Sequence, residues 1–159
     1  MWQRIQSVFL GIAILSLILG LFFYPVLSCL DKGINYRLYA MNFVIKEQGP
    51  NGKLIMSSAF PYSITAILMV AAMTIAIMEF RRFDNRMVQV KLGTLNSLIL
   101  AGVMICDVLF SIQMFKAYQI EWKYDLSFYL AFVAIVCNWL AIRFIRRDEK
   151  LVRDSDRIR

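Results

Sequence analysis

The sequence predicts an all-α membrane protein: a four-transmembrane-helix bundle with a small external loop or β-hairpin after the first helix and a cytoplasmic helical tail. The 159 residues are 60% hydrophobic and include no histidine, whereas soluble domains are usually about 45–50% apolar. Four stretches carry almost no charge, at 5–30, 54–78, 92–115 and 126–142. Each approaches the roughly 20 residues that a helix needs to cross a bilayer core. Such unbroken runs favour helices over the alternating strands of a membrane barrel.

The first predicted helix covers residues 5–24 and ends before Pro25, which cannot continue it. An external segment at 28–58 follows. Within it, Tyr36 to Ile45 is rich in aromatic and β-branched residues, the 48–52 segment has turn chemistry, and Lys53 to Met56 could return as a strand. An irregular loop at the membrane interface is the alternative that this segment leaves open.

The other three predicted helices are separated by short connections, so that consecutive helices should be antiparallel neighbours. The second begins near Pro61, which suits a first helical turn because its missing N–H would be unpaired there. Glu79, Arg81 and Arg82 mark its cytoplasmic edge. The predicted helices are 61–80, 92–115 and 126–145, joined by a cytoplasmic loop at 81–91 and an external loop at 116–125, with a cytoplasmic tail at 146–159.

Lysine and arginine are divided unequally between the two sides that this topology creates. Basic residues resist translocation, so the richer side is expected in the cytoplasm. We therefore expect a bacterial inner-membrane protein with both termini in the cytoplasm. The net charge of +7 is interpreted as a determinant of membrane orientation and of attraction to anionic lipid, and not as a sign of nucleic-acid binding. The richer side holds 12 of the 18 basic residues: Arg4, Arg81, Arg82, Arg86, Lys91, Arg143, Arg146, Arg147, Lys150, Arg153, Arg157 and Arg159.

Asp107 is the one ionisable residue well inside a predicted span, and intramembrane carboxylates are costly enough to be functional candidates. It lies toward the external side of its helix. The structural interpretation is that Asp107 is protonated, hydrogen-bonded to a neighbouring hydroxyl or amide, or wetted by the external loop. The functional interpretation is a proton or cation relay.

Asn96 and Asn138 are further polar residues in the third and fourth predicted helices. Each can form a hydrogen bond between helices at about 1 kcal/mol. Neither is expected at the level of Asp107, so we predict interhelical hydrogen bonding and not one shared site. Together these three residues form the candidate intramembrane polar site.

Other chemistry finds little support in the sequence. The three cysteines, Cys29, Cys106 and Cys137, build no disulfide framework. Cleavage of a lipoprotein signal before Cys29 is an alternative, but Pro25 and Leu27 stand where such sites prefer small residues. Without histidine, a Cys-x-x-Cys pair or a glycine-rich phosphate loop, we expect no enzyme, no catalytic residue, no metal and no cofactor. A lipid-acting enzyme using Asp107 with external tyrosines is the less favoured alternative.

Both ends of the chain carry recognisable motifs. Residues Met1 to Ser7 run directly into an apolar helix, Tyr36 to Tyr39 lie in the external loop, and the chain closes on Ile142 to Arg153 and Asp156 to Arg159. These motifs resemble a Gram-negative bacterial family of four-span inner-membrane proteins catalogued as domain of unknown function 4293. The resemblance implies a fold and a location, with no substrate, cofactor or catalytic residue to transfer.

The motif residues form a candidate cytoplasmic interface. Arg4 could meet Asp148 or Glu149 and hold the two ends of the bundle together; docking of a partner onto the same patch is the competing use. The residues of this candidate interface are Arg4, Gln6, Arg146, Arg147, Asp148, Glu149 and Arg153.

The sequence favours an accessory or scaffold subunit of a larger membrane assembly, because the loops are small. A small proton- or ion-coupled transporter using Asp107 is the alternative. Small residues four apart, as at Gly93 and Ser97, let helices approach closely, either within the chain or in a dimer. The expected partners are the lipid bilayer and a membrane protein or second copy, with no nucleic acid.

Overall fold

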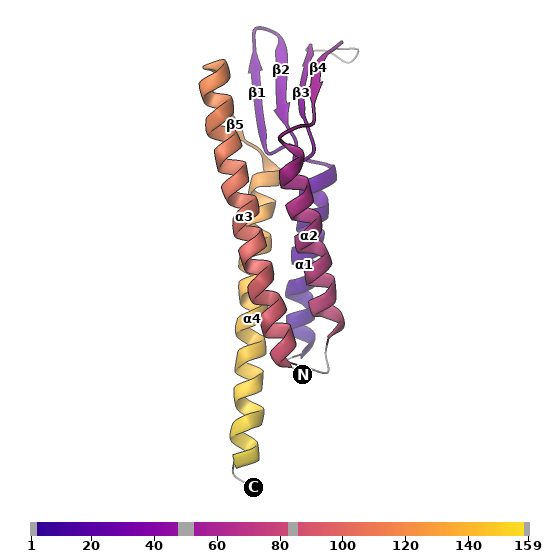
Figure 1. Ribbon diagram of the computed structural model, residues 1–159, viewed down its shortest axis with the longest axis vertical. Helices are drawn as coiled ribbons and strands as arrows, with labels where there is room; N and C mark the ends of the chain where they lie inside the picture. Colours follow the sequence, from indigo (N-terminus) through magenta and orange to yellow (C-terminus); the bar gives the residue numbers. More distant parts are fainter. Residues whose placement is uncertain (1–2, 48–52, 83–85, 158–159) are drawn as a thin grey trace.

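The chain forms four long helices and a five-stranded antiparallel sheet (Figure 1). The computed structural model describes residues 3–47, 53–82 and 86–157, with side chains described for 5–47, 53–82 and 86–151. Each helix is long and apolar enough to cross a membrane. The helices are α1 (Gln3–Phe22), α2 (Ser63–Arg81), α3 (Arg86–Tyr118) and α4 (Leu126–Arg157).

The helices lie side by side, and each packs mainly against two others: α1 and α3 each contact α2 and α4. Small side chains line the seams between them. Ala72, Ala76 and Ala134 are fully buried, and Ser127 of α4 donates a hydrogen bond of 2.9 Å to the carbonyl of Gly20 in α1. Close approach of this kind compensates for the missing hydrophobic driving force between helices in lipid.

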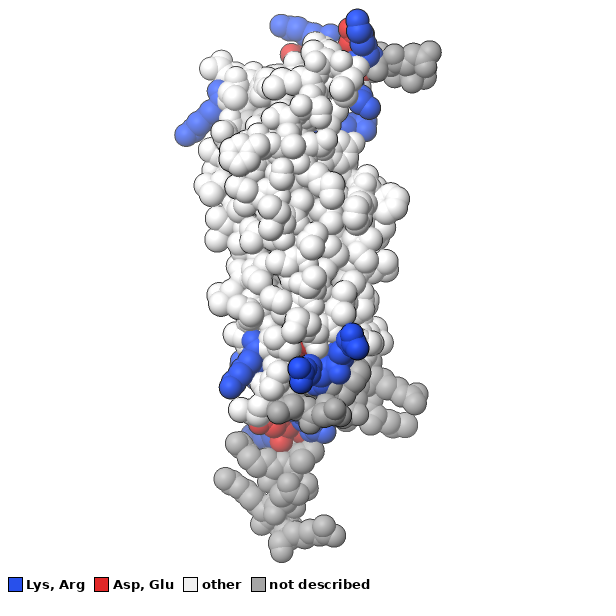
Figure 2. Space-filling view, turned by 45° about the vertical axis from the view of Figure 1, so that its right-hand side comes forward, with Lys and Arg blue, Asp and Glu red and all other residues white. Residues whose placement is uncertain are grey.

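The chain begins α1 and ends α4 at the same end of the molecule, opposite the sheet (Figure 1). We call this the basic end, because the end of α2, the start of α3 and the last part of α4 carry basic residues there. The described ones are Arg81, Arg82, Arg86, Arg146, Arg147 and Lys150. The opposite end is the sheet end. Charged side chains gather at both ends and leave a wide uncharged belt between them (Figure 2). Apolar side chains such as Leu98 and Ile67 are exposed on this belt, as lipid contact requires.

The sheet is built from the predicted external segment and the connection before α4. Its strand order is β4-β3-β2-β1-β5, with antiparallel pairing throughout. Lys32 and Gly33 join β1 and β2 with positive φ angles of 47° and 78°, the backbone of a tight two-residue hairpin turn. The strands are β1 (Leu27–Asp31), β2 (Ile34–Leu38), β3 (Phe43–Glu47), β4 (Leu54–Ser58) and β5 (Lys123–Tyr124).

The structure corrects the expected strand over 36–45. This segment is divided between β2 and β3, because the chain reverses where the Tyr39 N–H donates to the Asn42 carbonyl at 2.8 Å. A hairpin of β3 and β4 is present, although its predicted turn at 48–52 lies outside the described residues. The hairpin of β1 and β2 was not predicted, nor was β5 within the predicted loop at 116–125.

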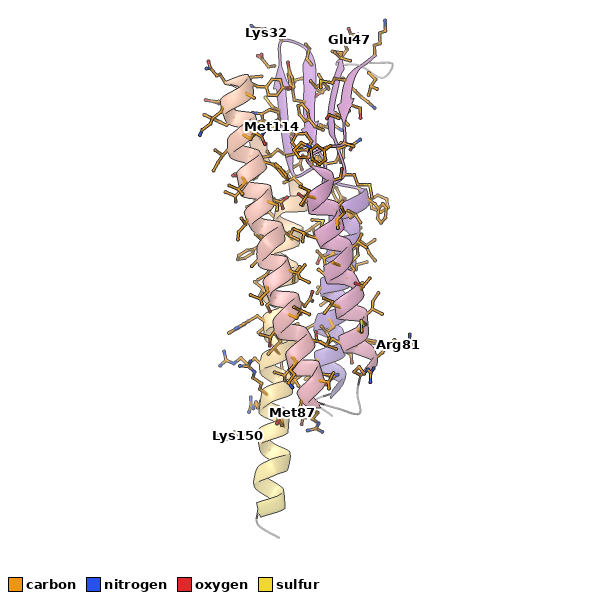
Figure 3. The ribbon with its side chains drawn as sticks, viewed as in Figure 1. Lys32, Glu47, Arg81, Met87, Met114 and Lys150 are labelled. Carbon is orange, nitrogen blue, oxygen red and sulfur yellow. The ribbon has the colours of Figure 1, made fainter. Side chains whose placement is uncertain are left out.

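Aromatic side chains join the sheet to the helices. Tyr118 at the end of α3 packs against Tyr36 and Phe43, with ring centroids 5.5 and 5.6 Å apart. Trp122 completes this aromatic cluster, and Met114 is buried beside it where α3 meets the strands (Figure 3). The sheet is therefore a packed cap and not a loose loop.

The helix bounds differ from the predicted ones mainly at the basic end. Residues 86–91, predicted as loop, belong to α3, and α4 continues from the predicted span without interruption to Arg157. At the sheet end, α2 begins at Ser63 instead of Pro61, because residues 59–62 form a turn in which the Ser63 N–H donates to the Ala59 carbonyl.

Candidate functional site

An amide network connects α3 and α4 near the basic end. Asn96 Nδ2 donates to Asn138 Oδ1 at 3.0 Å, while Asn138 Nδ2 donates to the Gly93 carbonyl at 3.0 Å and to Ser97 Oγ at 2.8 Å. Both asparagines are fully buried. The structure thus brings the two predicted asparagines together as interhelical hydrogen-bonding groups. We keep the name amide network for Asn96, Asn138, Gly93 and Ser97.

Glu79, near the end of α2, adds a carboxyl group to this layer. The sequence interpretation placed it with Arg81 and Arg82 at the edge of the predicted span. In the structure its side chain is fully buried, with an exposed fraction of 0%. Its carboxyl group faces Gly93, where an added Cβ would lie 2.8 Å from Oε1. A side chain at this position of α3 would require the carboxyl group to move.

Three acceptor atoms in this layer have no hydrogen-bond donor among the described residues. They are Oε1 and Oε2 of Glu79 and Oδ1 of Asn96. The nearby Gln89 amide does not satisfy them, because its Nε2 donates to the main-chain carbonyl of Glu79 at 3.1 Å. A buried acceptor without a donor costs about 1–3 kcal/mol, so this layer has the chemistry to hold a proton or another small donor.

Asp107 lies on the same buried face of α3 but in a different layer. Its exposed fraction is 2%, and its Oδ2 has no hydrogen-bond partner among the described residues. This burial contradicts the interpretation that the external loop wets the carboxyl group. Ser111 is one turn away, yet its hydroxyl donates to the main-chain carbonyl of Asp107 at 2.6 Å.

Asp107 and the amide network do not form one site. Eleven residues separate Asn96 from Asp107 on α3, which places them roughly 16 Å apart along the helix. Leu100 and Val103 fill the space between them, and Met69 of α2 packs into the same core. These side chains are almost completely buried, so they form an apolar seal between the two polar layers.

At the candidate cytoplasmic interface, one member forms an ion pair that the sequence did not predict. Asp148 forms an ion pair with Arg86 at the start of α3, with 3.0 Å between Oδ2 and Nη1. The predicted contact of Arg4 with Asp148 or Glu149 lies outside the described residues, because the side chain of Arg4 is not described. The side chain of Arg153 is not described either. Of the other members of the candidate interface, Gln6 is buried, Glu149 is half-buried, and Arg146 and Arg147 are exposed.

A groove of about 380 Å³ opens between α3 and α4 near the basic end. Ser97 of the amide network forms part of its floor. Arg143 lies over the ring of Trp139, 5.4 Å from the centroid. We call this cavity the α3–α4 groove; its lining residues are Thr94, Ser97, Trp139, Ile142, Arg143 and Arg146.

A larger cavity, of about 740 Å³, lies at the sheet end between β1, β2 and the segment before β5. Cys29 lines it beside Asp31, Glu121 and Lys123. Burial raises the pKa of the Cys29 thiol, and the negative charge of Asp31 raises it further. The thiolate is the reactive form, so this cavity does not activate Cys29. Within the described part of the chain, no three cysteine or acidic side chains are grouped to hold a metal ion.

Sequence reasoning missed Glu79 and the α3–α4 groove. A signal for Glu79 was available: Met69, Ala72, Ala76 and Glu79 follow one another at helical spacing, and all four are buried on one face of α2. The groove has no comparable signal, because it depends on how α3 and α4 approach each other.

Comparison with known proteins gives a family and no activity. The model of a family described as "Domain of unknown function (DUF4293)" matches residues 2–158. No curated protein matches the chain.

Proposed function

This chain belongs to the DUF4293 family, and we propose that it is an accessory or scaffold subunit of a larger assembly in a bacterial inner membrane. In this proposal the four helices cross the bilayer and both termini lie in the cytoplasm. The expected partners are lipid and a membrane protein or a second copy. The proposal assigns no reaction, cofactor or nucleic acid to the chain.

One observation carries the scaffold role: α4 extends well past the other helices at the basic end (Figure 1). The ion pair between Arg86 and Asp148 is the last contact of this kind between α3 and α4 among the described residues. Nine further residues, 149–157, remain helical, which corresponds to roughly 13 Å of helix. Leu151 on this extension is 54% exposed. Most helical stability in proteins comes from packing against a partner, so a docking partner that covers Leu151 would explain why α4 continues beyond the bundle.

The orientation of the proposal is supported by charge. On the predicted topology one side of the membrane receives 12 of the 18 lysines and arginines, and the positive-inside rule assigns such a side to the cytoplasm. The apolar seal at Leu100 and Val103 supports the scaffold role over transport, because it interrupts any polar path between Asp107 and the amide network.

Photo-crosslinking in cells tests the scaffold role. A photoreactive residue at exposed Leu151 is expected to capture a specific membrane partner or a second copy. The matched control is Ile145, one to two turns earlier on α4 and 1% exposed, which should capture no partner. An extension that yields no adduct, together with a single band after affinity purification from native membranes, would contradict the scaffold role.

A proton- or ion-coupled transporter using Asp107 is the second candidate. The observation that favours it is the buried Oδ2 of Asp107, which has no partner among the described residues, because such carboxyl groups often mark ion pathways. Flux into liposomes containing the wild type or Asp107→Asn tests this candidate. Equal flux removes the role assigned to Asp107.

A further inference from the structure

Two arginines of α4, Arg143 and Arg146, line the α3–α4 groove. Arg143 and Arg146 are one turn apart on α4, so their guanidinium groups share a face of the helix. Both side chains are exposed and line the groove. Neither has a carboxylate within 4 Å among the described residues, whereas Arg86 does. Two guanidinium groups that lie one turn apart, with no carboxylate partner among the described residues, form a site suited to a phosphate group.

The groove also has the features of a membrane interface. Trp139 is 54% exposed, and its ring lies under Arg143. Tryptophan prefers the level of the lipid headgroups, where its ring contacts both apolar and polar groups. Figure 2 shows charged side chains along the border of the uncharged belt at this end of the molecule. The groove therefore lies where the proposed membrane orientation puts the inner-leaflet headgroups.

Hydroxyl groups on the α3 side of the groove present acceptors and not donors. Thr94 Oγ1 donates its proton to the Val90 carbonyl at 2.6 Å, and Ser97 Oγ donates to the Gly93 carbonyl at 3.1 Å. Ser97 Oγ also accepts from Asn138 Nδ2. The lone pairs that remain can accept hydrogen bonds from hydroxyl groups of a ligand. The groove thus combines an anion site on α4 with hydrogen-bond acceptors on α3.

Toward the sheet end, both walls of the groove continue as exposed apolar side chains. On α3, Leu98 lies four residues after Thr94, and Ile105 lies seven residues after Leu98. On α4, Val136 lies three residues before Trp139, and Phe132 lies four residues before Val136. These spacings keep each series on one face of its helix. A free phosphate would leave this surface unused, whereas acyl chains would cover it.

We propose that the α3–α4 groove binds an anionic phospholipid whose headgroup carries hydroxyl groups, as in phosphatidylglycerol. The phosphate lies between Arg143 and Arg146, the headgroup hydroxyls face Thr94 and Ser97, and the acyl chains follow the apolar surface toward the sheet end. A zwitterionic lipid fits less well, because its cationic group would lie close to the two guanidinium groups. The inference rests on the proposed membrane location and is independent of the scaffold role.

Lipid-dependent stability of the purified full chain tests the proposal. Thermal unfolding in detergent is measured with added phosphatidylglycerol, phosphatidylcholine or inorganic phosphate, and bound lipid is counted by native mass spectrometry. The groove variant is Arg143→Ala with Arg146→Ala. The matched control is Arg81→Ala with Arg82→Ala, which removes two exposed arginines from the same end of the molecule but outside the groove.

We expect phosphatidylglycerol to stabilise the wild type and the control equally, and the groove variant to need at least about tenfold more lipid. Phosphatidylcholine and inorganic phosphate should have much smaller effects. Equal lipid dependence of the groove and control variants would overturn the proposal, as would protection by phosphate alone at similar concentrations.

A second measurement covers the case in which the groove variant does not fold. A photoreactive phosphatidylglycerol analogue is crosslinked to the wild type, and the modified peptides are mapped. Adducts on both groove walls, near Thr94 and Trp139, support the site, whereas adducts elsewhere reject it. If the stability of the protein shows no preference for phosphatidylglycerol but a photoreactive residue at Leu151 still captures a partner, the lipid site alone is rejected. If phosphatidylglycerol binds specifically but Leu151 captures no partner, the scaffold role alone is rejected.

Discussion

Gly93→Ala should loosen the packing of α3 against its neighbours. The added Cβ would lie 2.7 Å from Cγ1 of Ile142 on α4 and 2.8 Å from Oε1 of Glu79 on α2. A real Cβ essentially never lies this close to another non-bonded heavy atom, so the neighbouring side chains would have to move. Because the two clashes come from different helices, α3 cannot escape one by moving toward the other.

The expected cost follows from two opposing terms. Overpacking a buried site costs about 1–3 kcal/mol, while replacing glycine by alanine inside a helix gains about 1 kcal/mol. Gly102→Ala receives the same gain without the clash, because its Cβ would meet only Leu68 Cδ1 at 3.8 Å. Gly11→Ala, with nothing within 4 Å, is a second control. The difference between Gly93→Ala and either control should therefore be about 1–3 kcal/mol.

Unfolding by sodium dodecyl sulfate in mixed micelles, followed by circular dichroism, measures these free energies. The penalty of Gly93→Ala should also shrink in an Ile142→Ala background, since that change removes the Cγ1 atom that the new Cβ meets. Equal unfolding free energies for Gly93→Ala and Gly102→Ala would refute the packing argument.

Three further predictions use the same purified protein. Asn138→Ala should destabilise more than Asn96→Ala, because Asn138 takes part in three hydrogen bonds of the amide network and Asn96 in one. At about 0.6 kcal/mol per interhelical bond, the unfolding free energies of the two variants should differ by about 1 kcal/mol, and equal losses would contradict the network. Asp148→Asn should lower the free energy of unfolding by about 1 kcal/mol or less. High salt should reduce this difference, because the ion pair with Arg86 is partly exposed. A loss of stability that does not depend on salt would count against the ion pair. The rate at which maleimide modifies Cys29 should keep rising above pH 9.0. Burial and, to a smaller extent, the negative charge of Asp31 raise the pKa of its thiol above the ordinary value of 9.0. A rate that levels off at or below pH 9 would contradict this raised pKa.

The helices could be predicted from the sequence because lipid imposes a simple rule: long uncharged runs must satisfy their backbone internally. The buried face of α3 follows the same logic, with Asn96, Leu100, Val103 and Asp107 at spacings of four and three residues. Helix ends were harder to predict. A charged residue marks where the hydrocarbon region ends, but it does not mark where the helix ends. At the basic end, α3 and α4 both include charged residues beyond their apolar runs.

The sheet and the contacts at the basic end depend on long-range pairing that local patterns do not contain. Leu27 pairs with Tyr124, almost a hundred residues later in the chain, and two strands of five residues looked like one longer strand. Asp148 meets Arg86 because α3 begins earlier than its apolar run. Glu79 was assigned to the edge because it neighbours arginines, although its spacing from Ala76 and Ala72 places it on the buried face.

Cysteine accessibility across the membrane tests the central claim, four crossings with the basic end in the cytoplasm, most directly. Glu47 lies at the tip of the sheet and Lys150 on the extension of α4, at opposite ends of the molecule (Figure 3); both side chains are exposed. In a background without native cysteines, a membrane-impermeant maleimide should label Glu47→Cys in intact spheroplasts. It should label Lys150→Cys only after the membrane is opened. Labelling of Lys150→Cys in intact spheroplasts, or equal labelling of both positions, would contradict the proposed topology.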